Sequence, residues 1–264
     1  MSIATSHIFG SETGGMSTLA GAQPHPVAGI SGKLTPELIE PAIRGKKINA
    51  PRTALITIEN THNHAGGTYY TIAEMAAIRN LADQYSLAIH VDGARIMNAA
   101  VAQNVTLADL AQHADSLQMC LSKGLCAPVG SVLVGTHDFI QEARRYRRLL
   151  GGGMRQAGIL AAAGIVALKV MVNRLKEDHL HARILGESLA KTKLIIDLDS
   201  IQTNIVMINV SSLGVTAAQF IEKLQVYNIR ASEFGKYKVR MVTHNDVSRE
   251  NIEYVIKIVT QLAK

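Results

Sequence analysis

The sequence is poor in aromatic residues and in cysteine. Its 264 residues include no Trp and two Cys, aromatics make up 4%, and hydrophobic residues make up 47%. The core must therefore be built from Ala, Ile, Leu, Val and Met, and the length suits one large domain or a large one with a small one. Cys120 and Cys126 do not have a zinc-site spacing, and so few cysteines exclude a disulfide-rich scaffold.

The sequence also lacks targeting and membrane signals. No charged-then-apolar segment opens the chain, and the apolar uncharged run 156–168 is shorter than the ~20 residues of a membrane span. We therefore expect a cytoplasmic protein with no membrane partner. The net charge of +6 is modest, and the basic run 144–148 has no aromatic stacking stripe or nucleic-acid motif beside it. This run predicts a solvated or subunit-facing helix and no nucleic-acid partner.

The stretch 88–130 holds two apolar runs of strand length. The first ends on Asp92 and the second is followed by Lys123. The segment between them is long enough for a crossover helix, so the strands should be parallel and both groups should lie at the carboxyl edge of one sheet. An acid and an amine there, with Arg95 nearby, suit pyridoxal 5'-phosphate (PLP), which requires a lysine and a carboxylate. From spacing alone, a helix-capping acid and a solvated lysine explain the same residues.

Other segments have clear periodicity. The β-branched run 54–60 predicts a buried strand, and residues 72–85 repeat as an amphipathic helix. The run 156–193 predicts a long helix whose Ala- and Gly-rich start should be buried at a domain or subunit seam. Strands at 203–210 and 238–244, with helices at 217–227 and 247–262, predict a separate small α/β domain.

Three motifs decide between these readings: HVDGAR at 90–95, SKGLCAPVGSVL at 122–133 and LLGGGMRQAGILAAAG at 149–164. Together they resemble the threonine aldolases of the β-eliminating lyase family, which are fold-type I PLP enzymes. The resemblance implies an α/β fold with a mainly parallel sheet, crossover helices and a smaller C-terminal α/β domain. We expect a large PLP-binding domain at 1–155, a connecting helix at 156–193 and the small domain at 194–264.

The resemblance also implies roles for individual residues. Lys123 would bind PLP covalently and Asp92 would hold its pyridine nitrogen, while Arg95 and Arg155 would be further cofactor contacts. His7, in SHIF, would stack on the cofactor ring, although Ser11 stands where the family commonly has an aromatic residue. His62, in ENTHN, would accept the proton of the substrate hydroxyl. Arg240, in VRMVTHNDVSRE, would bind the substrate carboxylate through its bidentate fork.

His62 and His64 could alternatively form half of a metal site. No third ligand cluster accompanies them, so we expect no metal. His7 and Arg240 have plainer alternatives too, as a structural histidine after a strand and as a surface arginine on an edge strand.

These residues predict a PLP-dependent aldehyde-lyase that cleaves L-threonine or L-allo-threonine to glycine and an aldehyde. Serine hydroxymethyl transfer and β-elimination are close alternatives on the same scaffold. The expected partners are a small amino-acid substrate and further copies of the chain, in a homodimer or homotetramer. The family usually has further residues at the start, including a loop that binds the cofactor phosphate. The second hypothesis is therefore a truncated, catalytically silent relative that only folds or pairs with a subunit.

Overall fold

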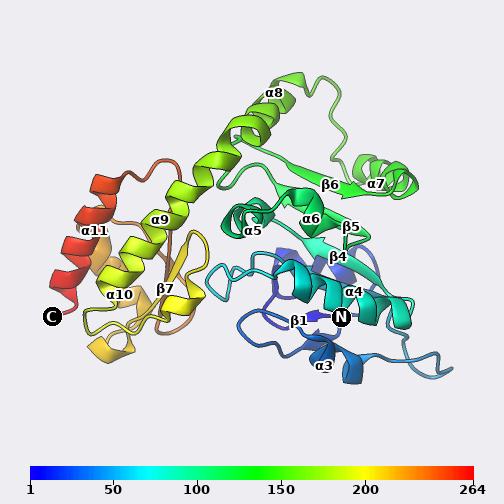
Figure 1. Cartoon of the computed structure of the whole chain (residues 1–264), viewed down its shortest axis with the longest axis horizontal. Coiled ribbons are helices and arrows are strands. Elements are labelled where there is room, and N and C mark those ends of the chain that lie inside the picture. The colour runs from blue at the N-terminus through cyan, green and yellow to red at the C-terminus, as the bar shows by residue number, and fades with distance from the viewer. The chain divides into compact units, whose positions relative to one another are not determined.

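The chain divides into two compact units. The computed structural model describes residues 1–264; the first unit comprises 1–61 and 70–172, and the second comprises 62–69 and 173–264 (Figure 1). The long helix expected to connect two domains is instead shared between the units. The loop 62–69 belongs with the C-terminal part of the chain, although in sequence it lies between two segments of the first unit. Sequence order alone could not show that the loop 62–69 belongs to the second unit.

The first unit is built on a four-stranded sheet. Its strands lie in the order β3 (Leu55–Glu59), β4 (Ala88–Asp92), β5 (Ser116–Cys120) and β6 (Ser131–Gly135). Strands β3, β4 and β5 are parallel, and β6 runs antiparallel to β5. The expected mainly parallel sheet is confirmed, and so is the adjacency of the strands that precede Asp92 and Lys123.

Crossover helices connect the parallel strands. Helix α4 (Ile72–Gln84) lies between β3 and β4, and α5 (Ile96–Gln103) and α6 (Leu107–Ala111) lie between β4 and β5 (Figure 1). Helix α4 begins with a capping box, because the Thr71 hydroxyl accepts from the Glu74 N–H while the Glu74 carboxylate accepts from the Thr71 N–H. Its buried side chains, including Met75 and Ile78, cover the sheet.

The two faces of the sheet differ in polarity. Side chains alternate along a strand, and in-register neighbours share a face. One face carries buried apolar residues: Ile56, Ile58, Ile89, Val91, Leu117 and Met119. The other face carries a polar row at the carboxyl end, where Glu59 pairs in register with Asp92 and Asp92 with Gln118. This polar face gives the unit its candidate site.

The N-terminal segment differs from expectation. A strand running into His7 was expected, but β1 is only Ser2–Ile3, and it pairs in parallel with β2 (Pro26–Val27). The Ser6 N–H and hydroxyl both bond the carbonyl of Ile3, at 3.1 and 2.8 Å. This turn ends the strand, and His7 therefore begins a short helix instead of leaving a strand.

The remaining elements of this segment are short. They are α1 (His7–Gly10), η1 (Glu12–Gly14), α2 (Gly15–Thr18), α3 (Pro36–Ile39) and η2 (Glu40–Ala42). Helix α3 begins after Thr35, and Pro36 stands in its first turn.

A basic helix and a long apolar helix follow the sheet. Helix α7 (His137–Leu149) has no buried residue. Helix α8 (Gly158–Val166) continues through η3 (Ala167–Met171) into α9 (Val172–Leu189) without interruption, over 32 residues. By length and composition alone this helix could cross a membrane, although charged residues enter its second half. Within the chain the expected burial of its start is not found, because Ile159 is 86% exposed.

The second unit combines an antiparallel sheet with helices. Its antiparallel sheet has the order β7 (Ile205–Asn209), β9 (Lys238–Val242) and β8 (Ser232–Glu233). Helices α10 (Ala217–Gln225) and α11 (Arg249–Leu262) accompany it, with short turns η4 (Leu198–Ser200) and η5 (Ser211–Leu213). Its core includes Val206, Ile208, Phe220, Leu224, Val239, Ile252 and, from α9, Leu185 and Leu189.

Candidate active site

Asp92 is the last residue of β4, and it is held by its neighbours. Its Oδ1 accepts a 2.6 Å hydrogen bond from Gln118 Nε2 on β5 and a 3.2 Å bond from the Ala94 N–H. These two donors fix the direction of the carboxylate. Asp92 can therefore present a charged oxygen to a cationic ring nitrogen.

Lys123 follows the neighbouring strand, β5, and emerges at the same edge of the sheet. Its side chain is exposed and lines a small hollow together with Gly93, Arg95 and Cys120. Asp92 does not line this hollow. Both charges nevertheless act on one group, because the Asp92 carboxylate raises the pKa of His7 and the Lys123 amine lowers it. Asp92 and Lys123 thus follow neighbouring parallel strands at one edge of the sheet, and their roles toward a cofactor stay a prediction.

His7 lies against a carboxylate that the sequence analysis did not select. Oε1 of Glu59 is 3.0 Å from the ring Nδ1 of His7, and Oε2 of Glu59 accepts a 2.6 Å hydrogen bond from the His7 N–H. The hydrogen bond to Glu59 raises the pKa of His7 above its usual range, against the effect of burial. The signal for Glu59 was present, since it is an acid at the end of a buried strand, as Asp92 is.

Arg95 is half-buried at the start of α5. Burial lowers the pKa of its guanidinium, while Glu59, Cys120 and Asp92 raise it. A buried cation of this kind requires anionic neighbours, and the arrangement keeps it close to the polar row. Arg95, the predicted cofactor contact, therefore lies near the carboxylates of Glu59 and Asp92.

Arg155 does not join this cluster. It is exposed in the turn between α7 and α8, where its carbonyl oxygen accepts a 2.8 Å hydrogen bond from the Ala157 N–H. The glycines before it allow a chain reversal, as the positive φ of Gly151 (83°) shows. Within the chain, Arg155 is thus a solvent-facing residue.

The remaining predicted residues, His62 and Arg240, lie in the second unit. Nη1 of Arg240, on β9, donates a 2.6 Å hydrogen bond to Oδ1 of Asn63, and its guanidinium lies 4.2 Å from the ring centre of Phe234. The amide and the aromatic face hold the guanidinium in one orientation. Neither partner was selected from the sequence: Asn63 stands next to His62 in ENTHN, and Phe234 lies in none of the motifs that carry the resemblance.

His62 is 1% exposed and begins the loop that carries Asn63. Its Nδ1 accepts a 3.2 Å hydrogen bond from the Ala65 N–H, and its own N–H donates to Thr68 O at 2.7 Å. A neutral imidazole that accepts at Nδ1 carries its proton on Nε2. In this arrangement Nε2 is a donor, and acceptance of a proton there requires the Ala65 bond to break.

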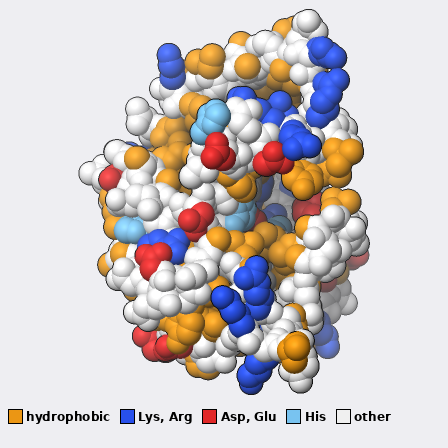
Figure 2. Space-filling model, turned by 90° about the vertical axis from the view of Figure 1, so that its right-hand side faces the viewer, with side chains coloured by type: hydrophobic (Ala, Val, Ile, Leu, Met, Phe, Trp, Pro, Cys, Tyr) orange, Lys and Arg blue, Asp and Glu red, His pale blue; other side chains and the backbone are white.

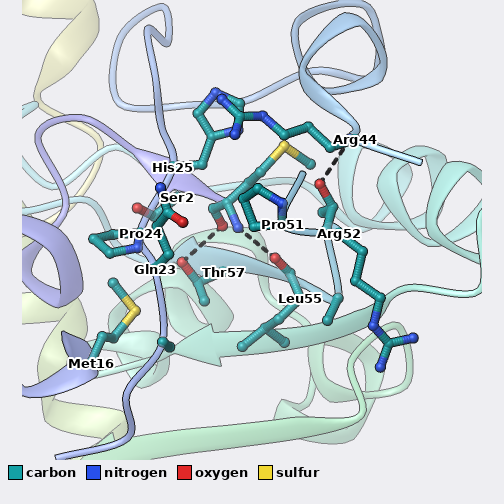
Figure 3. A pocket seen from close by; sticks show the side chains of 14 residues that line it. Ser2, Met16, Gln23, Pro24, His25, Arg44, Pro51, Arg52, Leu55 and Thr57 are labelled. Atoms are coloured by element: carbon teal, nitrogen blue, oxygen red, sulfur yellow. Dashed lines mark hydrogen bonds between the residues drawn. The ribbon is translucent and has the colours of Figure 1, made fainter. Parts of the chain in front are cut away.

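No group of three metal-ligating side chains is found. A cavity of about 290 Å³ opens near the amino end of β3, where Ser2, His25 and Arg44 surround it (Figure 3). None of the predicted site residues lines this cavity, which lies at the opposite end of β3 from Glu59.

Comparisons with known proteins show which family the chain belongs to. The sequence model of the β-eliminating lyase family matches residues 2–212. The low specificity L-threonine aldolase of Escherichia coli is 41% identical over 250 residues, which cover 94% of this chain and 72% of that protein. An uncharacterized protein of Caenorhabditis elegans is 42% identical over 233 residues, which cover 86% of this chain and 56% of its own length.

The fold is likewise shared. The structure of Leishmania major threonine aldolase superposes with a TM-score of 0.82 at 20% identity, covering all of this chain and 77% of that one. This chain spans between about half and three quarters of the length of the proteins that it matches. The matched family model and the identity to the Escherichia coli protein establish that the chain belongs to the β-eliminating lyase family.

Proposed function

We propose that the protein is a PLP-dependent aldehyde-lyase of the threonine aldolase type, which cleaves L-threonine or L-allo-threonine to glycine and acetaldehyde. The observation that carries the proposal is the parallel, in-register pairing of β4 with β5, which brings Asp92 and the strand before Lys123 to one sheet edge. The low-specificity threonine aldolase name of a 41% identical relative supports it.

The residues of the first unit fit PLP. Asp92 is already held as a charged acceptor by Gln118, so it suits the protonated pyridine nitrogen, and Lys123 supplies an exposed amine for covalent attachment. PLP, when bound, takes up the electron pair that is left at Cα when the Cα–Cβ bond breaks. His7 is held in one orientation by Glu59 and offers its ring as the stacking surface.

The residues of the second unit suit the substrate. Arg240 presents an oriented guanidinium, whose fork matches a carboxylate. His62, with its proton on Nε2, would hold the β-hydroxyl by donating to it. The hydroxyl proton leaves as the aldehyde forms, so His62 can accept it at Nε2 only after the Ala65 N–H has left Nδ1 and the ring hydrogen has moved from Nε2 to Nδ1. The expected role as a base is thus retained with this added step.

A homo-oligomer, a dimer or a tetramer, is part of the proposal. Helix α8 exposes Ile159, Ile165 and Val166, which are 86%, 54% and 53% exposed, and Figure 2 shows hydrophobic side chains in several groups beside Lys and Arg on one face of the molecule. A second copy covering α8 would remove this apolar surface from water. Arg155, exposed just before α8, would then contact the cofactor from a subunit boundary. We propose that the enzyme acts in the cytoplasm.

Catalysis of threonine cleavage tests the proposal. Protein supplied with PLP and L-threonine should release acetaldehyde and glycine in equal amounts, measured by aldehyde reduction with a coupled dehydrogenase. The Lys123→Ala variant should lose this activity, while Lys46→Ala, which changes an exposed lysine of the same unit, should keep it. Absence of acetaldehyde from the wild-type protein, or equal activity in Lys123→Ala, contradicts the proposal.

A further inference from the structure

Glu59 is a buried carboxylate at the carboxyl end of β3. Its side chain is 3% exposed, and it pairs in register with Asp92 on β4. A buried carboxylate is costly unless it is paired and hydrogen-bonded. The contacts of Glu59 therefore have to offset the cost of burying its charge.

Both carboxylate oxygens of Glu59 contact His7. Oε2 accepts from the His7 backbone N–H at 2.6 Å, and Oε1 lies 3.0 Å from Nδ1 of the ring. The first contact satisfies an N–H at the start of α1, where Ser6, the N-cap residue, makes no side-chain cap bond. The second contact fixes the ring itself. Together they hold the backbone and the imidazole of one residue from a rigid strand.

The contact at Nδ1 also determines where the imidazole carries its proton. A carboxylate only accepts hydrogen bonds, so Nδ1 must carry a hydrogen in both the neutral and the charged form of the ring. The charged groups that act on His7 are Glu59 from β3, Asp92 from β4 and Lys123 from beyond β5, and the two carboxylates outweigh the amine. The ring is therefore held as an Nδ1–H species with a raised pKa.

We propose that Glu59 is a positioning residue, which fixes the ring plane of His7 and keeps the hydrogen on its Nδ1. Its effect on the reaction rests on the proposed function, in which His7 lies against the cofactor ring; its effect on His7 does not. A ring held in this way presents the same face and the same tautomer to every cofactor molecule that binds. The imidazole is then already ordered in the free protein, so cofactor binding loses no further entropy by ordering it.

The Glu59→Gln variant tests this inference, because it preserves size while it reverses the hydrogen bond. The amide oxygen can still accept from the His7 N–H, but the amide NH₂ would then donate to Nδ1 and move the ring hydrogen to Nε2. Nitrogen chemical shifts of ¹⁵N-labelled histidine, followed against pH without cofactor, report both the tautomer and the pKa. We expect Nδ1–H in the wild type, and in Glu59→Gln an Nε2–H ring with a lowered pKa.

Glu74→Gln is the matched control. Glu74 is also paired and partly buried in the first unit, with Lys33 at 2.8 Å, but it is not in the polar row. The Glu74→Gln variant should leave the nitrogen chemical shifts of His7 unchanged. An Nε2–H ring in the wild-type protein overturns the inference whether or not any variant folds, and so does an Nδ1–H ring with an unchanged pKa in Glu59→Gln.

The kinetic arm separates this inference from the proposed function. Glu59→Gln should lower kcat/KM for threonine roughly tenfold and shift the acid limb of its pH profile, and it should add nothing further once His7 is replaced by Phe. An active enzyme whose Glu59→Gln variant keeps the wild-type rate and pH profile would refute the role of Glu59 while the lyase activity stood. An inactive wild-type protein with the expected histidine signals would refute the lyase activity alone.

Discussion

Gln118 Nε2 lies 2.6 Å from Oδ1 of Asp92 and donates to it across the parallel pair β4–β5. This bond fixes the carboxylate that would hold the ring nitrogen of PLP. Replacing Gln118 by Leu should weaken PLP binding about tenfold, since a hydrogen bond to a charged group contributes roughly 1.5–3 kcal/mol. Titration of PLP by absorbance measures the effect.

Gln112→Leu is the control for this substitution, because Gln112 is exposed and bonds only the backbone of its own helix, at Asp109 O. Equal PLP affinities for Gln118→Leu and the wild type would show that Asp92 needs no support from β5.

Arg240 is the residue that we expect to govern substrate affinity. Lysine at this position keeps the charge but loses the fork and the stacking on Phe234. Arg240→Lys should therefore raise KM for threonine roughly tenfold with a smaller change in kcat. Arg230→Lys, at an exposed arginine of the same unit, should leave KM unchanged, and steady-state kinetics would show whether the two variants differ as expected.

Cys126 has a backbone conformation that favours glycine. Its φ is 62°, and its Sγ donates a long 3.4 Å hydrogen bond to Gly124 O. Glycine relieves strain at positive φ but costs entropy in the unfolded chain, so Cys126→Gly should stabilise the protein by about 0.5–1 kcal/mol. Urea unfolding should show a higher midpoint for Cys126→Gly than for the wild type. Cys126→Ala keeps the strain, so its midpoint should not rise. A lower midpoint for the glycine variant would contradict the strain argument.

His179, on α9, should make the second unit sensitive to acid. Burial lowers the pKa of His179 to about 4, below the value of about 6.5 in the unfolded chain. The unfolded chain then binds the proton first, so this contribution to stability is complete above pH 6.5 and is lost as the pH falls toward 4. Between pH 7 and pH 5 the loss should be about 2 kcal/mol, from 1.5 pKa units at 1.36 kcal/mol each.

The free energy of unfolding at the two pH values checks this expectation. His179→Gln should reduce its fall between pH 7 and pH 5, whereas His137→Gln, at a side chain that is 81% exposed, should not. An equal fall in all three proteins would show that His179 is protonated as readily in the fold as outside it.

Strands β4 and β5, and the residues Asp92 and Lys123 at their carboxyl ends, could be predicted from the sequence. Apolar runs ending on Asp92 and before Lys123 predicted a parallel pair, and β4 and β5 form it in register. Such runs are informative because a buried parallel strand must be apolar along most of its length. The helices at 72–85 and 217–227 were likewise predicted from their periodicity, and α4 and α10 confirm them.

The sequence could not supply lateral relationships. The bond from Gln118 to Asp92, and the contact of Glu59 with His7, depend on which residues face each other across strands. That register arises from the packing of the whole sheet and leaves no local pattern. His7 was placed on a strand for a similar reason, since the apolar run at 2–9 does not reveal that Ser6 turns the chain at Ile3.

Covalent trapping of PLP tests the central claim most directly. Protein incubated with PLP, reduced with borohydride and digested should yield one pyridoxyl-labelled peptide, with the label on Lys123 as located by mass spectrometry. The wild type should be yellow before reduction and Lys123→Ala should carry no label. A label on a different lysine, or a colourless wild-type protein with no label, would contradict the account.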